Sequence, residues 1–140
     1  MSINYFSEAI DFQLDNQEHI SKWISEIIEN HQFTLLELNY IFCSDDYLLE
    51  INKQHLDHDY FTDIITFDNS EEKLEIESDI FISIDRVNDN AEKRSLLMEI
   101  ELHRVMIHGV LHLLGFGDKT ESEKKLMREK EDTCLSLLKI

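Results

Sequence analysis

The sequence predicts an α+β fold, in which a single small mixed β-sheet of about four strands is covered by about five helices. Segments with helical spacing and segments with alternating apolar residues mix along the chain, which favours helices packed on one sheet. Apolar residues make up 42% of the chain, enough to bury a core. There is no proline and no low-complexity tract to mark a linker, so we expect residues 1–140 to form one domain.

The first half of the chain is expected to form a helix, a strand and a second helix. Residues 17–31 predict a helix because apolar side chains recur at helical spacing, at Ile20, Trp23, Ile24, Ile27 and Ile28. Residues 33–44 predict a strand because apolar side chains alternate, at Leu36, Leu38, Tyr40 and Phe42. The pair Ser44-Asp45 is typical of a helix N-cap, and it indicates a helix over residues 45–56.

The second half is expected to contain two strands and three helices. Residues 63–68 predict a short strand, and residues 74–85 predict a longer one with alternating Ile76, Ile80, Ile82 and Ile84. Asp85 is expected to cap a helix over residues 86–94, and a long helix follows over about 96–114. Thr120 and Glu123 form a capping-box pattern. This pattern begins a last helix, and we expect one side of that helix to carry the apolar residues Leu126, Met127, Cys134, Leu137 and Leu138.

Charge and composition restrict the class of protein. The formal charge of −17 argues against a nucleic-acid binder, but residues 1–103 carry −18 and residues 104–140 carry +1. Residues 104–140 therefore stay compatible with nucleic-acid binding, and the alternative is that the chain has an ordinary acidic surface. No apolar run is long enough to span a membrane, and the first residues lack a signal-peptide pattern. Cys43 and Cys134 show no paired spacing, so we expect reduced thiols and a cytoplasmic protein.

The stretch HGVLHLLGFGD, residues 108–118, contains all three glycines of the chain. His108 and His112 are four residues apart, so on a helix they share one face and can reach one metal ion, as in His-x-x-x-His zinc sites. Gly115 suits the position after a helix end, where a positive φ is favoured, and Gly117 permits a further tight turn. The chain can then return Asp118 to the helix end. Gly109 leaves room for another element or a ligand to approach beside His108.

Two alternatives bear on this stretch. The histidines can instead be hydrogen-bonded residues of a buried helix, because a histidine pair at this spacing is weak evidence by itself. Gly109 argues against a zinc protease of the H-E-x-x-H type, since it occupies the position of the catalytic glutamate and cannot act as a base.

The pattern H-G-x-L-H-L-x-G, with a ligand at its eleventh position, resembles the signature of the YbeY family of bacterial metal-dependent, single-strand-specific endoribonucleases. Residues 62–67 resemble the family's T-D-V-L-S-F, with Asn52 at the matching distance before them, and residues 78–80 resemble its G-D-I strand. Met127 and Glu131 match its last helix. The resemblance implies a hydrolase that acts in rRNA maturation and ribosome biogenesis. Its expected partners are single-stranded RNA of the small ribosomal subunit and the ribosome or its assembly proteins; we also expect a monomer.

The metal ligands expected from the motif are His108, His112 and Asp118, holding one divalent ion, for which we expect Zn²⁺, with water in the fourth position. The ion would activate that water for attack on a phosphodiester. The family usually has a third histidine where this chain has Asp118, and many members have an arginine where it has Leu56. Arg104 is our candidate for contacting substrate in its place. The alternative for Arg104 is a helix-surface charge paired with Glu101.

The general base is left open between metal-bound hydroxide and the weaker candidates Asp63 and Asp79, each of which fits a capping or strand-end residue better than a direct catalytic role. Two other functions also stay open: a metal-dependent hydrolase of another substrate, and a ribosome-assembly binding protein whose metal is mainly structural. A set of two histidines and one carboxylate also occurs in non-haem iron oxygenases, which leaves the metal itself undecided.

Overall fold

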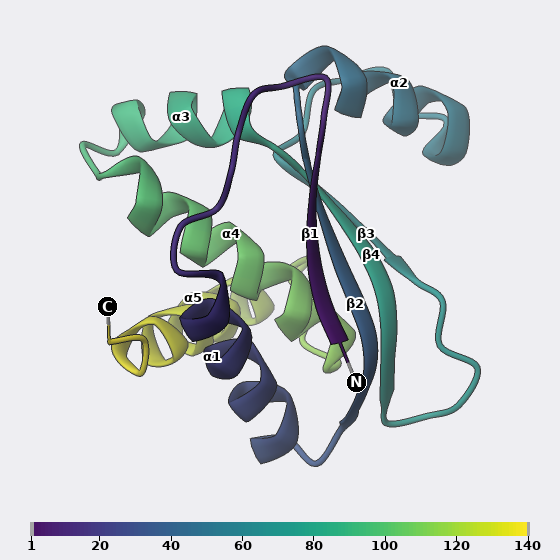
Figure 1. The fold of residues 1–140 in the computed structure, drawn as a ribbon, viewed down its shortest axis with the longest axis vertical. Helices are drawn as coiled ribbons and strands as arrows, with labels where there is room; N and C mark the ends of the chain where they lie inside the picture. The colour runs from purple at the N-terminus through teal and green to yellow at the C-terminus, as the bar shows by residue number, and fades with distance from the viewer. Residues whose placement is uncertain (1, 140) are drawn as a thin grey trace.

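In the computed structural model, which describes residues 2–139, five helices surround one four-stranded sheet (Figure 1). This confirms the predicted α+β class. In chain order the elements are β1 (Ser2–Glu8), α1 (Gln17–Asn30), β2 (Thr34–Cys43), α2 (Asp45–Leu56), β3 (Ile64–Asp68), β4 (Glu75–Ser83), α3 (Ile84–Lys93), α4 (Met98–Leu113) and α5 (Glu121–Ser136).

The sheet is mixed, with strand order β1-β2-β4-β3. β1 pairs in parallel with β2, β2 pairs in parallel with β4, and β3 runs antiparallel to β4 at the opposite edge. β1 is a strand that the sequence pattern did not predict. It is an edge strand without a fully buried residue, so it lacks the apolar alternation that marks a half-buried strand.

The main core lies between one face of the sheet and helices α1 and α4, which lie on the same side in Figure 1. All five apolar residues predicted for α1 are buried. In β2 the predicted alternation is wrong at Leu36, which is 36% exposed, while Leu35 is buried. A β-bulge between Leu35 and Glu37 shifts the register there, and the alternation resumes correctly at Leu38. A smaller apolar cluster forms where α2 covers the opposite face.

Two of the three predicted helix caps are confirmed. The Ser44 hydroxyl accepts a hydrogen bond from the Tyr47 backbone N–H, and Thr120 and Glu123 form the full capping box. The predicted cap at Asp85 is wrong. Ser83 caps α3 by accepting from the Arg86 N–H, so Asp85 lies inside the first turn.

The predicted apolar side of α5 is only partly correct. Met127 and Cys134 are buried, whereas Leu126 and Leu137 are 44% and 57% exposed. Both cysteines are buried free thiols. Among residues 2–139, no helix is both long enough and apolar enough to cross a membrane.

Helix α4 lies close against the sheet at Gly109. A Cβ added there would lie 3.0 Å from the Cδ1 atoms of Ile64 and Ile80 and 3.2 Å from the Thr66 hydroxyl. The close approach expected at Gly109 is therefore made by β3 and β4. It holds the histidines of α4 beside the β3 edge of the sheet.

Candidate metal centre

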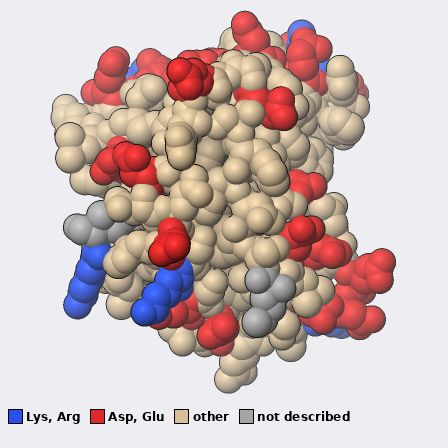
Figure 2. Space-filling view, in the orientation of Figure 1, with Lys and Arg blue, Asp and Glu red and all other residues tan. Residues whose placement is uncertain are grey.

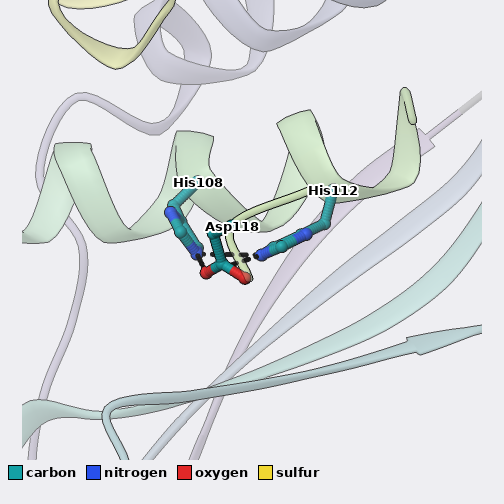
Figure 3. A group of neighbouring side chains, drawn as sticks. All are labelled: His108, His112 and Asp118. Atoms are coloured by element: carbon teal, nitrogen blue, oxygen red, sulfur yellow. Dashed lines mark hydrogen bonds and ion pairs between the residues drawn. The ribbon is translucent and has the colours of Figure 1, made fainter. Parts of the chain in front are cut away.

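The side chains of His108, His112 and Asp118 point toward one another at the C-terminal end of α4 (Figure 3). The two Nε2 atoms are 3.0 Å apart, and Asp118 Oδ2 is 3.3 Å from each of them. The three residues predicted as ligands are thus brought together. Their side chains are 22%, 33% and 40% exposed, so the group can be reached from solvent.

The end of α4 explains how Asp118 reaches the histidines. The Phe116 N–H donates to the Leu111 carbonyl and the Gly115 N–H donates to the His112 carbonyl, which together form a Schellman motif. Gly115 has φ of 105°, as this motif requires of the residue after the helix end. The chain therefore turns back within three residues and places Asp118 beside His112.

Gly117 has a different role from the one expected. It has no positive φ, and a Cβ there would lie 2.5 Å from Glu123 Oε2. Glu123 also accepts hydrogen bonds from the backbone of Lys119 and Thr120. Gly117 therefore allows the capping carboxylate of α5 to pack against the segment that carries Asp118.

The three donor atoms fit a tetrahedral metal ion. Zinc bonds of about 2.0–2.2 Å to nitrogen and oxygen place two ligands of a tetrahedron about 3.3–3.6 Å apart. The observed separations of 3.0, 3.3 and 3.3 Å are close to these values. Two imidazoles and a carboxylate are also a set that zinc binds in catalytic sites, with a fourth position left for another ligand.

Glu131 orients His108 from the neighbouring helix α5. Its Oε2 accepts a hydrogen bond of 2.6 Å from His108 Nδ1, and its Oε1 accepts one of 2.9 Å from Arg104. A proton on Nδ1 leaves the Nε2 lone pair of the neutral ring directed at the other two ligands. A carboxylate that holds a metal-binding histidine in this way is common in metalloproteins.

This contact also changes the acidity of both groups. Burial lowers the pKa of His108, but the hydrogen bond and charge of Glu131 outweigh burial, and the pKa of His108 is raised. Burial raises the pKa of Glu131, but the hydrogen bonds from His108 and Arg104 outweigh it, and the pKa of Glu131 is lowered. Glu131 is therefore a carboxylate at neutral pH and a full negative partner for His108.

Two cavities share His108 and Asp118 of this group, and the first also contacts His112. The first, of about 570 Å³, lies between the β3 edge and the segment after α2, and its walls include Asn52, His58 and Tyr60. The second, of about 370 Å³, lies between α4 and α5. Both are lined by Asp63, Ile64, His108 and Asp118. An elongated ligand can therefore contact both cavities beside His108 and Asp118.

The other predicted site residues are divided between this site and the rest of the fold. Asp63 lines both cavities, and burial raises its pKa. Asp79 is not brought to the site. It accepts a hydrogen bond from Asn39 and, with Phe67 and Phe81, lines a separate cavity. Its neighbour Ile80 faces α4, so Asp79 lies on the opposite face of the sheet.

Arg104 lines the second cavity, and its guanidinium pairs with Glu131 at 2.9 Å and Asp132 at 2.7 Å. The alternative pairing with Glu101 is wrong, because Glu101 pairs with Arg94 at 2.6 Å. Leu56 lines the first cavity.

Sequence reasoning assigned no role to Glu131, and none to the segment of His58 and Tyr60. The Asn52 amide donates to the Tyr60 carbonyl at 2.9 Å and thereby holds that segment against the first cavity. A signal for Glu131 was available in the sequence. It lies four residues after Met127 and three before Cys134, so this carboxylate falls on the predicted apolar side of the last helix.

The whole chain is similar to known endoribonucleases. Residues 3–139 match the family model described as endoribonuclease YbeY. A protein of that name from Cytophaga hutchinsonii is 56% identical over 99% of this chain and 96% of its own length. One from Karelsulcia muelleri is 49% identical over 98% and 96%. A solution structure of a Thermotoga maritima protein superposes with a TM-score of 0.68 at 27% identity, and covers 96% of this chain and 87% of its own.

Proposed function

We propose that this chain, which belongs to the endoribonuclease YbeY family, is a metal-dependent endoribonuclease that cleaves single-stranded RNA. The observation that carries the proposal is the solvent-accessible group of His108, His112 and Asp118 at the junction of two cavities. Its donor atoms suit a divalent metal, and the cavities on either side offer room for a flexible strand.

We propose Zn²⁺ as the metal and the three residues as its ligands, because nitrogen and carboxylate donors at tetrahedral separations suit zinc. A bound zinc ion supplies a Lewis acid for the phosphodiester and lowers the pKa of a coordinated water. Glu131 holds the His108 ring in the tautomer that leaves Nε2 free to bind, and Arg104 holds Glu131.

Asp63 is our candidate for moving a proton during hydrolysis. It lines both cavities beside His108, and its burial raises the pKa of the carboxyl above the ordinary value for aspartate. A carboxylate with a raised pKa is a better proton acceptor near neutral pH. Asp79 is not part of this proposal because it lies on the opposite face of the sheet.

The biological setting follows from the family. We propose that the chain acts as a single domain and a monomer in the cytoplasm, on RNA of the small ribosomal subunit, in contact with the ribosome or its assembly proteins. A binding protein with a purely structural metal is less well supported. Structural zinc sites are closed and usually rich in cysteine, whereas this group is partly open to solvent and has no cysteine among its members.

The test is cleavage by the purified protein of a single-stranded RNA, compared with the same RNA in a duplex, single-stranded DNA, a phosphomonoester and a peptide. We expect cleavage of single-stranded RNA alone, loss of cleavage with a chelator, and recovery with zinc. Cleavage of another substrate class but not of RNA would support the alternative hydrolase. Metal-loaded protein that binds RNA without cutting it would support the assembly protein.

A further inference from the structure

We propose that Lys124 and Arg128 of α5 each bind a backbone phosphate of the substrate strand, one or more nucleotides away from the phosphate that is cut. The inference rests on the proposed function, because it concerns the same RNA. It assigns the second cavity to the strand's phosphates and leaves the first cavity for the rest of the substrate.

The two cavities differ in charge. Among the described residues that line the first cavity there is no lysine or arginine, and three aspartates are present: Asp63, Asp68 and Asp118. The second cavity is lined by four cations, Arg94, Arg104, Lys124 and Arg128, and by four carboxylates, Asp63, Glu101, Asp118 and Glu131, so only in this cavity do cations offset the acidic groups. Protein contacts to nucleic-acid phosphates come mostly from lysine and arginine, so the second cavity is the one suited to the backbone.

Two of these four cations are already neutralised. Arg94 pairs with buried Glu101 at 2.6 Å, and Arg104 pairs with Glu131 and Asp132. Lys124 has only a 3.9 Å contact with the fully exposed Glu121, which contributes little because water screens it. Arg128 has no ion-pair partner within 4.0 Å among residues 2–139. The positive charge available to a ligand of this cavity therefore comes from Lys124 and Arg128.

The helix explains why these two residues, and not their neighbours, serve the cavity. Lys124, Arg128 and Glu131 recur at intervals of four and three residues, so they lie on one face of α5. Glu131 on this face contacts His108, which directs the same face toward the metal centre. Lys125 and Lys130 are on the same helix but line neither cavity, and the Lys130 ammonium lies over the Phe116 ring.

The setting makes such a site necessary for an RNA substrate. The chain carries a formal charge of −17, and Figure 2 shows far more acidic than basic side chains on the face that it draws. A polyanion is repelled by most of this surface. A pair of uncompensated cations beside the metal centre gives the strand a local region of attraction and a preferred path past the ligands.

The experiment compares two double variants that remove the same charge from the same helix. Lys124→Gln with Arg128→Gln removes the proposed site, and Lys125→Gln with Lys130→Gln is the control. Binding of a single-stranded RNA oligonucleotide is measured by fluorescence anisotropy at several salt concentrations, with a chelator present so that the strand stays intact. Each lost phosphate contact lowers the slope of log affinity against log salt by about 0.7 for a single strand.

We expect the slope to fall by about 1.4 in the first variant and to stay near the wild-type value in the control. The single variants Lys124→Gln and Arg128→Gln should each lower it by about half as much. Equal slopes in the two double variants, or no RNA binding by the wild type, would overturn the inference. Chelator-sensitive cleavage by the wild type is scored separately. If cleavage is absent the proposed function fails, whereas cleavage with equal slopes overturns this site alone.

Discussion

Replacing Glu131 with glutamine is expected to weaken zinc binding although Glu131 is not a ligand. The substitution keeps the shape of the side chain and an oxygen that can accept from His108 Nδ1, but it removes the negative charge from a contact of 2.6 Å. The His108 ring then becomes less basic at Nε2, and its preferred orientation is less strongly fixed. The effect on the metal passes entirely through His108.

The structure sets the size of the effect. Loss of a carboxylate that orients a metal-bound histidine costs about 10–100-fold in metal affinity, or about 1.4–2.7 kcal/mol. The Glu131 side chain is 7% exposed, so water does not readily take its place. We expect about tenfold weaker binding for Glu131→Gln, where one hydrogen bond can persist, and about hundredfold for Glu131→Ala, where none can.

Asp132→Asn is the matched control. Asp132 also pairs with Arg104, at 2.7 Å, but it is 60% exposed and makes no contact with His108. Zinc affinity is measured by competition with a chromogenic chelator, together with thermal unfolding of each metal-free variant. Glu131→Gln and Asp132→Asn should differ in affinity by about tenfold. The reasoning is refuted if Glu131→Gln binds zinc as tightly as Asp132→Asn.

Three further predictions concern the same site. Asp118→Ala should lose tight zinc binding while Asp118→His retains it, measured as zinc per chain; equal metal content in both would remove Asp118 from the ligand set. Gly115→Ala should lower the free energy of unfolding by about 1–3 kcal/mol and weaken zinc binding, because φ of 105° is strained for alanine. Steric overlap does not contribute, since the added Cβ meets no atom within 4 Å. An unchanged denaturation midpoint would contradict this prediction. Because zinc needs neutral His108 and the pKa of His108 is raised, apparent zinc affinity should keep rising with pH beyond the ordinary histidine pKa before it levels off; a pH-independent affinity would oppose it.

The grouping of His108, His112 and Asp118 could be predicted from the sequence because local geometry brings these side chains together. Two histidines four residues apart share a helix face in any context, and Gly115 at the helix end returns the chain within a few residues. Neither relation depends on how the helices pack. The capping residues Ser44 and Thr120 were predictable for the same reason.

Features that depend on tertiary packing could not be predicted in this way. Glu131 lies 23 residues after His108, and its contact exists because α5 packs beside α4. The choice between Asp63 and Asp79 depends on which face of the sheet α4 covers, and strand alternation alone does not decide that. The strand β1 and the bulge at Leu35 arise from pairing with neighbours, so the apolar pattern carries no clear signal of either.

The central claim is that one metal ion held by three residues is required for cleavage of single-stranded RNA. The measurement that tests it most directly is the initial rate of cleavage while zinc is titrated into the metal-free protein, for the wild type and for His112→Ala. We predict that the wild-type rate rises linearly and levels off at one zinc ion per chain, and that His112→Ala stays inactive while it keeps its helical circular dichroism. Full activity of the metal-free wild type, or wild-type cleavage by His112→Ala, would contradict the claim.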